Sequence, residues 1–319
     1  MSRTRIVTLV CWLVSAVALL GLVVWLLLSG IFSFGFNLGI FEFGNFQVVG
    51  THSVPAADID SLDVDWTSGG VFIGTHSGDD IRITEFARRN LRAGEELSLG
   101  TEGSTLVIEF TENHRAVSIG FNNPQTKRLE VLIPYTLSEN FDRFYVNTVS
   151  GRVEVRNMQA HDFSVSTTSG RIELFGITAT NLRASTTSGR IELNTAEAED
   201  IHLHTVSGSI ETNNALAESL RTNTTSGRHE LSGSFGYVNA RSTSGRIEIR
   251  STIIPASLTA RTSSGRIAVT VPNEGAITVQ YSTGSGRFTS EMPVTTHGGA
   301  DAQFNLSTGS GRISIYELR

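Results

Sequence analysis

The feature that most constrains the fold of this chain is a short phrase that recurs along its second half. Residues Thr186–Leu193 spell Thr-Thr-Ser-Gly-Arg-Ile-Glu-Leu, and close copies begin at Thr167, Thr224 and Ser242. The glycines of the Ser-Gly pairs are Gly151, Gly170, Gly189, Gly208, Gly227, Gly245, Gly265, Gly286 and Gly311. Successive glycines lie 19, 19, 19, 19, 18, 20, 21 and 25 residues apart. A nearly fixed period of this length is typical of stacked repeats, in which each unit is too small to bury a core alone.

Each repeat predicts two short β-strands that meet at its Ser-Gly turn. In residues 181–193, apolar and polar side chains alternate on both sides of Ser188 and Gly189. Alternation with period two indicates strands that bury one face. Glycine readily adopts positive φ, so we expect Gly189 and its counterparts to do so at these turns.

Apolar residues also recur at equivalent positions of successive repeats. One set is Phe163, Leu182, Ile201, Leu220, Val238, Leu258 and Ile277, and another is Ile172, Ile191, Ile210, Ile247 and Ile267. A β-solenoid places such residues on top of one another, about 4.8 Å apart. The pattern therefore predicts an all-β solenoid of stacked two-strand repeats. An antiparallel meander is the competing architecture, although it does not require like residues to stack.

The N-terminal segment predicts a membrane anchor. Ile6–Leu28 is an apolar run without a charge, long enough to cross a bilayer as a helix. Arg3 and Arg5 precede it, and no further Lys or Arg occurs before Arg82, which places the N-terminus in the cytoplasm and the rest outside. The alternative is a cleaved secretory signal, but the run lacks a small-residue cleavage site. We expect a single-pass protein of the cell membrane.

The remaining chain divides into three further segments. Residues 1–30 form the cytoplasmic tip and anchor, 31–46 a juxtamembrane segment rich in Phe and Gly, 47–145 an irregular β section that caps the repeats, and 146–319 the solenoid. The single cysteine, Cys11, lies in the anchor, so the exported part has no disulfide. The chain ends on the apolar strand 313–318, and we expect this open edge to favour self-association.

Neither metal binding nor catalysis is favoured by the residues that usually support them. His202 and His204 share one face of a strand, but arginines at the equivalent positions of neighbouring repeats disfavour a cation. His229 occupies an apolar slot, so we expect it to be buried, neutral and bonded to a hydroxyl. Between Asp162 and Asp301 the only aspartate is Asp200. A polysaccharide-acting enzyme needs clustered acids in a cleft, so the shortage of aspartates favours a non-enzyme, with such an enzyme as the alternative.

Two outward columns of charge are the constellation best suited to binding. Arginines follow the Ser-Gly pairs at Arg152, Arg171, Arg190, Arg228, Arg246, Arg266, Arg287 and Arg312. Glutamates two residues later are Glu154, Glu173, Glu192, Glu211, Glu230 and Glu248. The last three arginines, Arg266, Arg287 and Arg312, have no matching glutamate, so they are candidates to bind anionic lipid or an anionic wall polymer. Few aromatic side chains are expected to point outward, which disfavours a sugar-stacking platform.

The anchor, the strand that ends in Val131-Leu132-Ile133-Pro134 and the serial Ser-Gly-Arg-Ile-Glu units together resemble the bacterial "putative adhesin" family. The resemblance implies a membrane-anchored β-strand repeat domain of the cell envelope with no agreed biochemical role. It implies an adhesin-like binding, scaffold or envelope-sensing module, with a purely structural spacer as the other alternative. No cofactor and no nucleic-acid partner are predicted for this chain of net charge −6, and another envelope protein is a further candidate partner.

Overall fold

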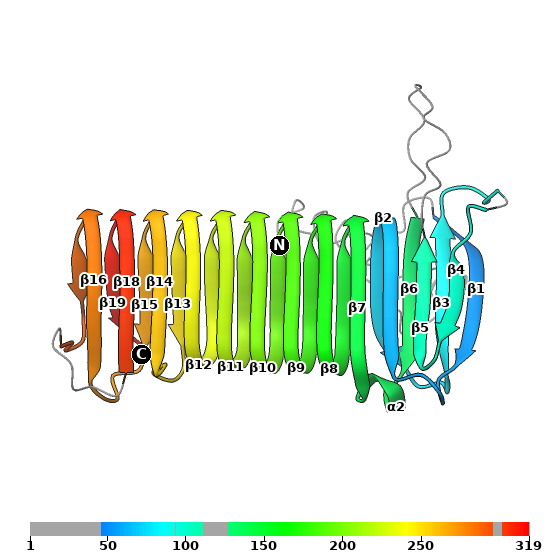
Figure 1. Cartoon of the computed structure of the whole chain (residues 1–319), viewed down its shortest axis with the longest axis horizontal. Coiled ribbons are helices and arrows are strands. Elements are labelled where there is room, and N and C mark those ends of the chain that lie inside the picture. The colour runs from blue at the N-terminus through cyan, green and yellow to red at the C-terminus, as the bar shows by residue number, and fades with distance from the viewer. Residues whose placement is uncertain (1–45, 93, 111–126, 296–301, 319) are drawn as a thin grey trace, which may run out of the picture. The chain divides into compact units, whose positions relative to one another are not determined.

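The strands of the repeats stack in parallel and in register. The structure is a computed structural model that describes residues 46–92, 94–110, 127–295 and 302–318. The central strands, in stacking order, are β7 (Phe141–Ser150), β8 (Val153–Ser169), β9 (Ile172–Ser188), β10 (Ile191–Ser207), β11 (Ile210–Ser226) and β12 (His229–Ser244). Val153 pairs with Ile172, and Ile172 pairs with Ile191 of the following coil. This parallel pairing confirms the predicted solenoid and excludes the meander (Figure 1).

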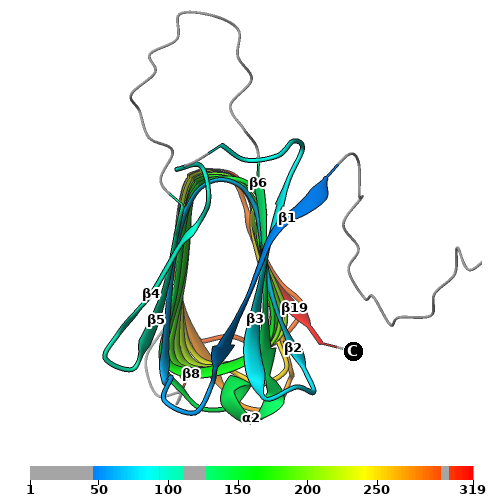
Figure 2. The same cartoon turned by 90° about the vertical axis from the view of Figure 1, so that its right-hand side faces the viewer.

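Each long strand runs from one Ser-Gly turn to the next and bends on the way (Figure 2). The residues with left-handed φ between the turns are Asn157, Gly176, Thr195 and Asn214, with φ of 55°, 62°, 54° and 53°. Asparagine and glycine tolerate this conformation, whereas a β-branched threonine is strained in it. This second corner was not predicted, because no single residue type marks it in the sequence.

The Ser-Gly turns need glycine for a reason other than the predicted one. Of the nine turn glycines, only Gly151, Gly265 and Gly311 have left-handed φ. The prediction of positive φ is therefore wrong for Gly189. A Cβ at Gly189 would instead lie 1.8 Å from the carbonyl oxygen of Gly170 in the neighbouring coil. Glycine allows successive turns to approach this closely and so to stack.

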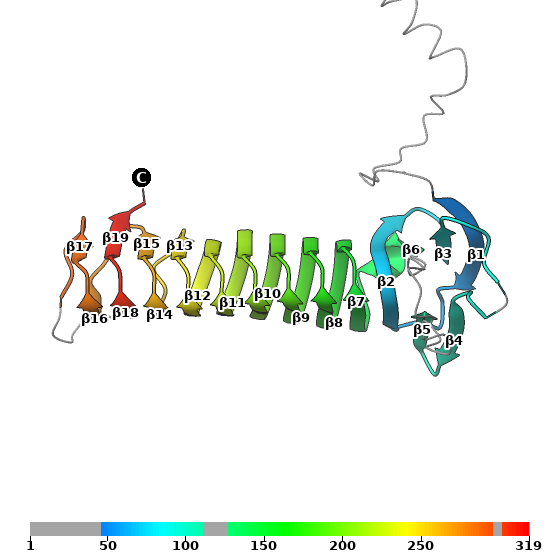
Figure 3. The same cartoon turned by 90° about the horizontal axis from the view of Figure 1, so that it is seen from above.

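The last two coils are stacked in the reverse of their order along the chain. The strands that follow β12 are β13 (Ile247–Ser251), β14 (Ser257–Ser264), β15 (Ile267–Val271), β16 (Ile277–Ser285), β17 (Phe288–Ser290), β18 (Ala302–Ser310) and β19 (Ile313–Glu317). Strand β18 pairs with β14 on one side and with β16 on the other, and β19 lies likewise between β15 and β17 (Figure 3). The C-terminal strand is thus not an open edge, which corrects the expectation for 313–318. The coil of β16 and β17 ends the stack instead.

A set of shorter strands closes the other end of the stack. It comprises β1 (Gln47–Pro55), β2 (Ser61–His76), β3 (Asp80–Ala87), β4 (Ser98–Glu102), β5 (Thr105–Phe110), β6 (Lys127–Pro134) and the short helix α2 (Tyr135–Ser138). Strand β2 continues the stack, because it pairs in parallel with β7 and β8 on one side and with β5 and β6 on the other. Strands β1, β3 and β4 then add in antiparallel fashion and cover this end (Figure 3).

The chain's only lysine is buried in this N-terminal cap. The side chain of Lys127 is fully buried, its Nζ lies 2.5 Å from Oε1 of Glu85, and it also donates to the carbonyl oxygen of Glu95. Nζ is 3.5 Å from the ring centroid of Phe110. Burial lowers the pKa of Lys127, and the bond to Glu85 acts in the opposite direction. The cap therefore holds a buried ion pair whose desolvation is offset by the contact between its two charges, by hydrogen bonds to the backbone of Glu95 and Leu97, and by the aromatic face of Phe110.

The predicted anchor Ile6–Leu28, with Cys11, lies outside the described residues, as does the Phe-rich segment except its last residue. Within the described residues, no helix is long and apolar enough to cross a membrane. Phe46, where the description begins, lies with its ring centroid 4.4 Å from the guanidinium carbon of Arg128 and 5.3 Å from that of Arg88. These cation–π contacts fix the point at which the chain enters the β-structure.

Candidate functional site

The two charged columns predicted from the sequence lie beside the Ser-Gly turns, and Ser209 interrupts the arginine column at one coil. Each arginine lies in the turn, and its carbonyl oxygen accepts a hydrogen bond from the adjacent coil, as Arg190 does from the amide of Ile172 at 2.9 Å. Each glutamate is the second residue of the next strand, so Glu173 pairs with Glu192 in register. The backbone of the stack therefore sets the spacing of both columns at about 4.8 Å per coil.

Ion pairs join the two columns and explain why like charges can stack. The guanidinium of Arg190 lies 3.0 Å from Glu192 in its own coil and 3.7 Å from Glu211 in the next. Opposite charges thus interdigitate, which removes the repulsion between glutamates of neighbouring coils. The hydrogen bond from Arg190 to Glu192 raises the pKa of Arg190.

The ladder of ion pairs becomes more exposed towards the C-terminal coils. The side chain of Glu173 is only 4% exposed and contacts both Arg171 and Arg152. The side chain of Glu248 is 36% exposed and contacts Arg246 at 3.0 Å. Pairs at the N-terminal coils are thus partly withdrawn from water, whereas those at the C-terminal coils are solvated pairs of small energetic value.

The glutamate column ends at Glu248, whereas the arginine column continues for three more coils. The register partners that follow Glu248 lack a carboxylate and are Ala268, Ser314 and Thr289. The arginines of the same coils, in stacking order, are Arg266, Arg312 and Arg287. All three are exposed, and none forms an ion pair with another described residue. We call these three residues the arginine strip. The structure places the three candidate residues on consecutive coils, although not in their order along the chain.

The outward histidines do not form a metal centre in the structure. His202 lies in register between Arg183 and Arg221, as expected. Burial lowers the pKa of His202, and the charges of His204 and the two arginines act in the same direction. Among the described residues, no group of three or more His, Cys, Asp or Glu side chains is placed to hold a metal ion.

His229 is fully buried in the column of isoleucines, in register with Ile210 and Ile247. Its Nδ1 lies 2.9 Å from the hydroxyl of Thr222, which confirms the predicted bond to a nearby hydroxyl. Burial lowers the pKa of His229 to about 4. The imidazole is therefore neutral at pH 7 and contributes to packing.

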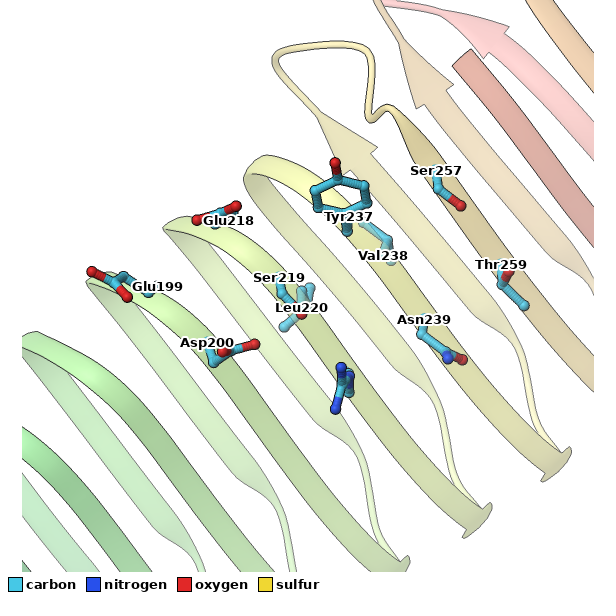
Figure 4. A pocket seen from close by; sticks show the side chains of 11 residues that line it. Glu199, Asp200, Glu218, Ser219, Leu220, Tyr237, Val238, Asn239, Ser257 and Thr259 are labelled. Atoms are coloured by element: carbon cyan, nitrogen blue, oxygen red, sulfur yellow. The ribbon is translucent and has the colours of Figure 1, made fainter. Parts of the chain in front are cut away.

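A surface groove that sequence reasoning missed crosses the outer face of β10, β11, β12 and β14 (Figure 4). It has a volume of about 440 Å³, and Asp200, Arg221 and Tyr237 are among the residues that line it. Tyr237 is 50% exposed, and it is one of the few outward aromatic residues that the sequence predicts for the repeats. The signal was available, because Tyr237 alternates with the buried Val238 and must face outward.

Comparisons with known proteins agree on the fold. A family model described as "Toastrack DUF4097" matches residues 59–316. A solved structure described as "Putative lipid binding protein" from Parabacteroides distasonis is 16% identical, with a TM-score of 0.53, and the match covers 87% of this chain and 98% of that one. A "putative adhesin" from the same organism is 15% identical, with a TM-score of 0.52 and coverages of 85% and 98%. The predicted resemblance to the "putative adhesin" family is confirmed, and at these identities the structures share the fold alone.

Two curated proteins match a shorter part of the chain. They are the cytochrome b6-f complex iron-sulfur subunits of Synechococcus elongatus and Thermosynechococcus vestitus, each 30% identical over 74 residues. The match covers 23% of this chain and 41% of theirs, so the chain spans about two fifths of the length of these relatives. Iron–sulfur clusters are held by several Cys or by Cys together with His. This sequence has one cysteine, Cys11, and so does not carry the ligands of such a cluster.

Proposed function

The chain belongs to the Toastrack DUF4097 family, and from its surface we propose that it is a non-enzymatic binding module of the cell envelope whose arginine strip holds anionic groups. The observation that carries this proposal is the end of the glutamate column at Glu248, beyond which Arg266, Arg312 and Arg287 occupy consecutive coils without a carboxylate partner among the described residues.

The geometry of the strip suits a ligand with repeated negative charges. A guanidinium is always charged and presents a planar fork of donors that matches phosphate or carboxylate oxygens. Three such groups on adjacent coils span about 10 Å at 4.8 Å per coil. They can therefore act together on successive phosphates of a polymer or on neighbouring lipid headgroups. In the preceding coils the same donors are engaged by glutamates such as Glu230, which lies 2.6 Å from Arg228.

We also propose the location of the module from the N-terminal sequence. Ile6–Leu28 acts as a single-pass membrane helix with a cytoplasmic N-terminus, and the β-solenoid lies outside the cytoplasm. The name of the Parabacteroides distasonis neighbour mentions lipid binding, and that protein shares only its fold with this chain. The arginine strip of this chain, and not the name of a neighbour, supports an anionic ligand.

The proposal is tested by binding measurements on the full-length chain held in uncharged detergent micelles. The probes are a soluble short-chain phosphatidylglycerol, a poly(glycerol phosphate) polymer and inorganic phosphate, which separate a lipid, a wall polymer and a simple anion as sources. We expect binding to at least one of the first two, and we expect it to weaken as salt rises because screening acts over about 8 Å at physiological ionic strength.

Matched variants separate the strip from the general charge of the surface. Replacing Arg266, Arg312 and Arg287 by Gln is expected to abolish binding. Replacing Arg190, Arg228 and Arg246 by Gln removes the same charge from coils where each arginine has a glutamate partner, and binding is expected to remain. Equal losses in both variants, or binding that does not respond to salt, would overturn the proposal.

A further inference from the structure

The groove on the outer face arises where one column of side chains stops. Glu199 and Glu218 occupy this column in successive coils, and Figure 4 shows both at the bends of their coils. Gly236 follows them in the next coil, and a Cβ added there would lie 2.8 Å from the carbonyl oxygen of Glu218. The carbonyl oxygen of Gly236 accepts a hydrogen bond from the amide of Ala256 in the coil after that. The column of long polar side chains thus ends at Glu218, and the small residues Gly236 and Ala256 that continue it leave a hollow beside Tyr237.

The ring of Tyr237 forms an exposed aromatic surface at this hollow. Its register partners are Ser219 and Ser257, which are both smaller and leave its sides uncovered. Half of the tyrosine is exposed, while the neighbouring Val238 is buried in the core and fixes the backbone below it. An aromatic ring that is held by a rigid strand and exposed to solvent on its outer side can stack against an apolar face of a ligand at low entropic cost.

Both hydrogen-bond donors and acceptors surround the ring. Asp200 supplies acceptors and Arg221 supplies donors, and neither side chain bonds to another described residue. Asn239 provides both kinds of group, although its Oδ1 already accepts a bond from Arg241 at 3.1 Å. A smaller hollow of about 130 Å³ shares Asp200 and Arg221 and extends the groove towards Arg183. The groove can therefore contact more than one unit of an extended ligand.

We propose that this groove binds a neutral saccharide, with one sugar ring stacked on Tyr237 and its hydroxyl groups bonded to Asp200, Asn239 and Arg221. A hydroxyl both donates and accepts, so it satisfies carboxylate, amide and guanidinium partners together. The carboxylates of Glu199, Asp200 and Glu218 repel an anion, which separates this ligand class from that of the arginine strip. The carboxylates stand exposed on the rim of the groove, an arrangement suited to binding and not to hydrolysis, which needs a carboxylic acid kept protonated.

The groove and the arginine strip are independent sites. Thr259, which lines the groove, precedes Arg266 of the strip by seven residues, or roughly 23 Å of extended chain at 3.3 Å per residue. The saccharide site therefore stands whether or not the strip binds anions, and each can be removed without altering the residues of the other.

The test uses the purified full-length chain and an array of neutral tetrasaccharides built from glucose, galactose, mannose or N-acetylglucosamine. We expect at least one of them to bind, and we expect Tyr237→Ala to weaken its affinity about tenfold, or about 1.4 kcal/mol. Tyr237→Phe keeps the stacking ring and is expected to retain binding. Asp200→Asn is expected to weaken binding, because it replaces a charged acceptor.

Two control variants establish whether the loss of binding is specific to the groove. Tyr145→Ala removes a tyrosine that is 37% exposed and lies outside the groove. The variant with Arg266, Arg312 and Arg287 replaced by Gln removes the arginine strip. Both variants are expected to bind saccharide normally. The proposal is overturned if no tetrasaccharide binds at about 10 mM, or if Tyr237→Ala and Tyr145→Ala behave alike. Stronger binding of a basic peptide such as oligolysine, lost in Asp200→Asn, or cleavage of the saccharide seen by mass spectrometry, would also overturn it.

Discussion

The two ends of the solenoid solve the same problem in different ways. A stack of parallel coils exposes its core and its backbone hydrogen-bonding groups at each end. At the N-terminal end the chain adds the antiparallel strands β1, β3 and β4, together with the buried pair of Lys127 and Glu85. At the C-terminal end it adds no new type of element, and instead threads its last coil between two earlier ones.

The difference shows that protecting a chain terminus and closing a core are separate tasks. Residues Ile313–Ile315 of strand β19 are paired on both sides, so this part of the strand cannot separate without breaking two ladders. At the final coil Met292 is buried, and the rings of Tyr281 and Phe288 stack with their centroids 4.1 Å apart. Tyr281 remains 47% exposed, so this end is less fully closed. Thr295 already bridges Thr278 at the outer edge of β16. If the chain associates with itself through an edge, the rest of β16, and not β19, is the strand that we predict to take part.

The order of the C-terminal coils can be tested by an all-or-none result. In the stack, Ser307 lies in register with Arg261 on one side and with Ser282 on the other. Cysteine pairs at 261/307 and at 307/282, made with Cys11 replaced by Ser, are expected to form disulfides, because neighbouring strands lie about 4.8 Å apart. The pair 261/282 lies two coils apart, about 9.6 Å, and is expected to stay reduced. Thiol titration and peptide mass spectrometry distinguish the three; a disulfide at 261/282 instead of 261/307 would show coils stacked in chain order.

The closure of the N-terminal end depends on the buried ion pair. Lys127→Met leaves Glu85 charged and uncompensated in the core, so we expect a loss of about 3–5 kcal/mol in the free energy of unfolding, measured by urea denaturation. Lys127→Met combined with Glu85→Leu replaces both charges by apolar groups and is expected to recover most of that loss. At the other end, Met292→Ala is expected to cost about 2 kcal/mol, the low end for a buried methionine. An equal or larger loss for Met292→Ala would mean that the two ends are closed to the same degree.

The regular part of this molecule could be predicted from sequence, because each coil repeats one pattern of buried residues. The Ser-Gly-Arg-Ile-Glu phrase identifies the turns, the columns and the solenoid as far as Ile267. The phrase does not predict the order of the last coils, because Val279 and Phe304 are equally suitable apolar residues for the position that stacks on Leu258. The predicted slot for Ile277 is in fact filled by Val279, and Phe304 lies between it and Leu258. Local patterns contain no information on which coil lies next to which once their lengths diverge.

The candidate sites divide along the same line. The arginine strip can be predicted from the repeat alone, because the sequence shows that the repeats after Glu248 lack a glutamate two residues after the arginine. The groove does not follow from it, because it results from two small residues, Gly236 and Ala256, in the two coils that follow Glu218. Lys127 was also missed as a structural residue. Its partner Glu85 lies 42 residues earlier in the chain, in a section without a period.

The smallest expected changes in the free energy of unfolding come from removing one glutamate at each end of the ion-pair ladder. Glu173→Gln removes a carboxylate that is 4% exposed and contacts both Arg152 and Arg171, so we expect a loss of about 1.5–3 kcal/mol, the range for hydrogen bonds to charged groups. Glu248→Gln removes one that is 36% exposed and contacts only Arg246 among the described residues, and we expect about 0–1 kcal/mol. Urea denaturation at low and high salt measures both. Salt should reduce the small effect of Glu248→Gln and leave most of the effect of Glu173→Gln, because buried pairs are screened less. If both variants lose the same small amount, burial of the ladder near the N-terminal end contributes nothing to stability, and the two ends differ only in how they are covered.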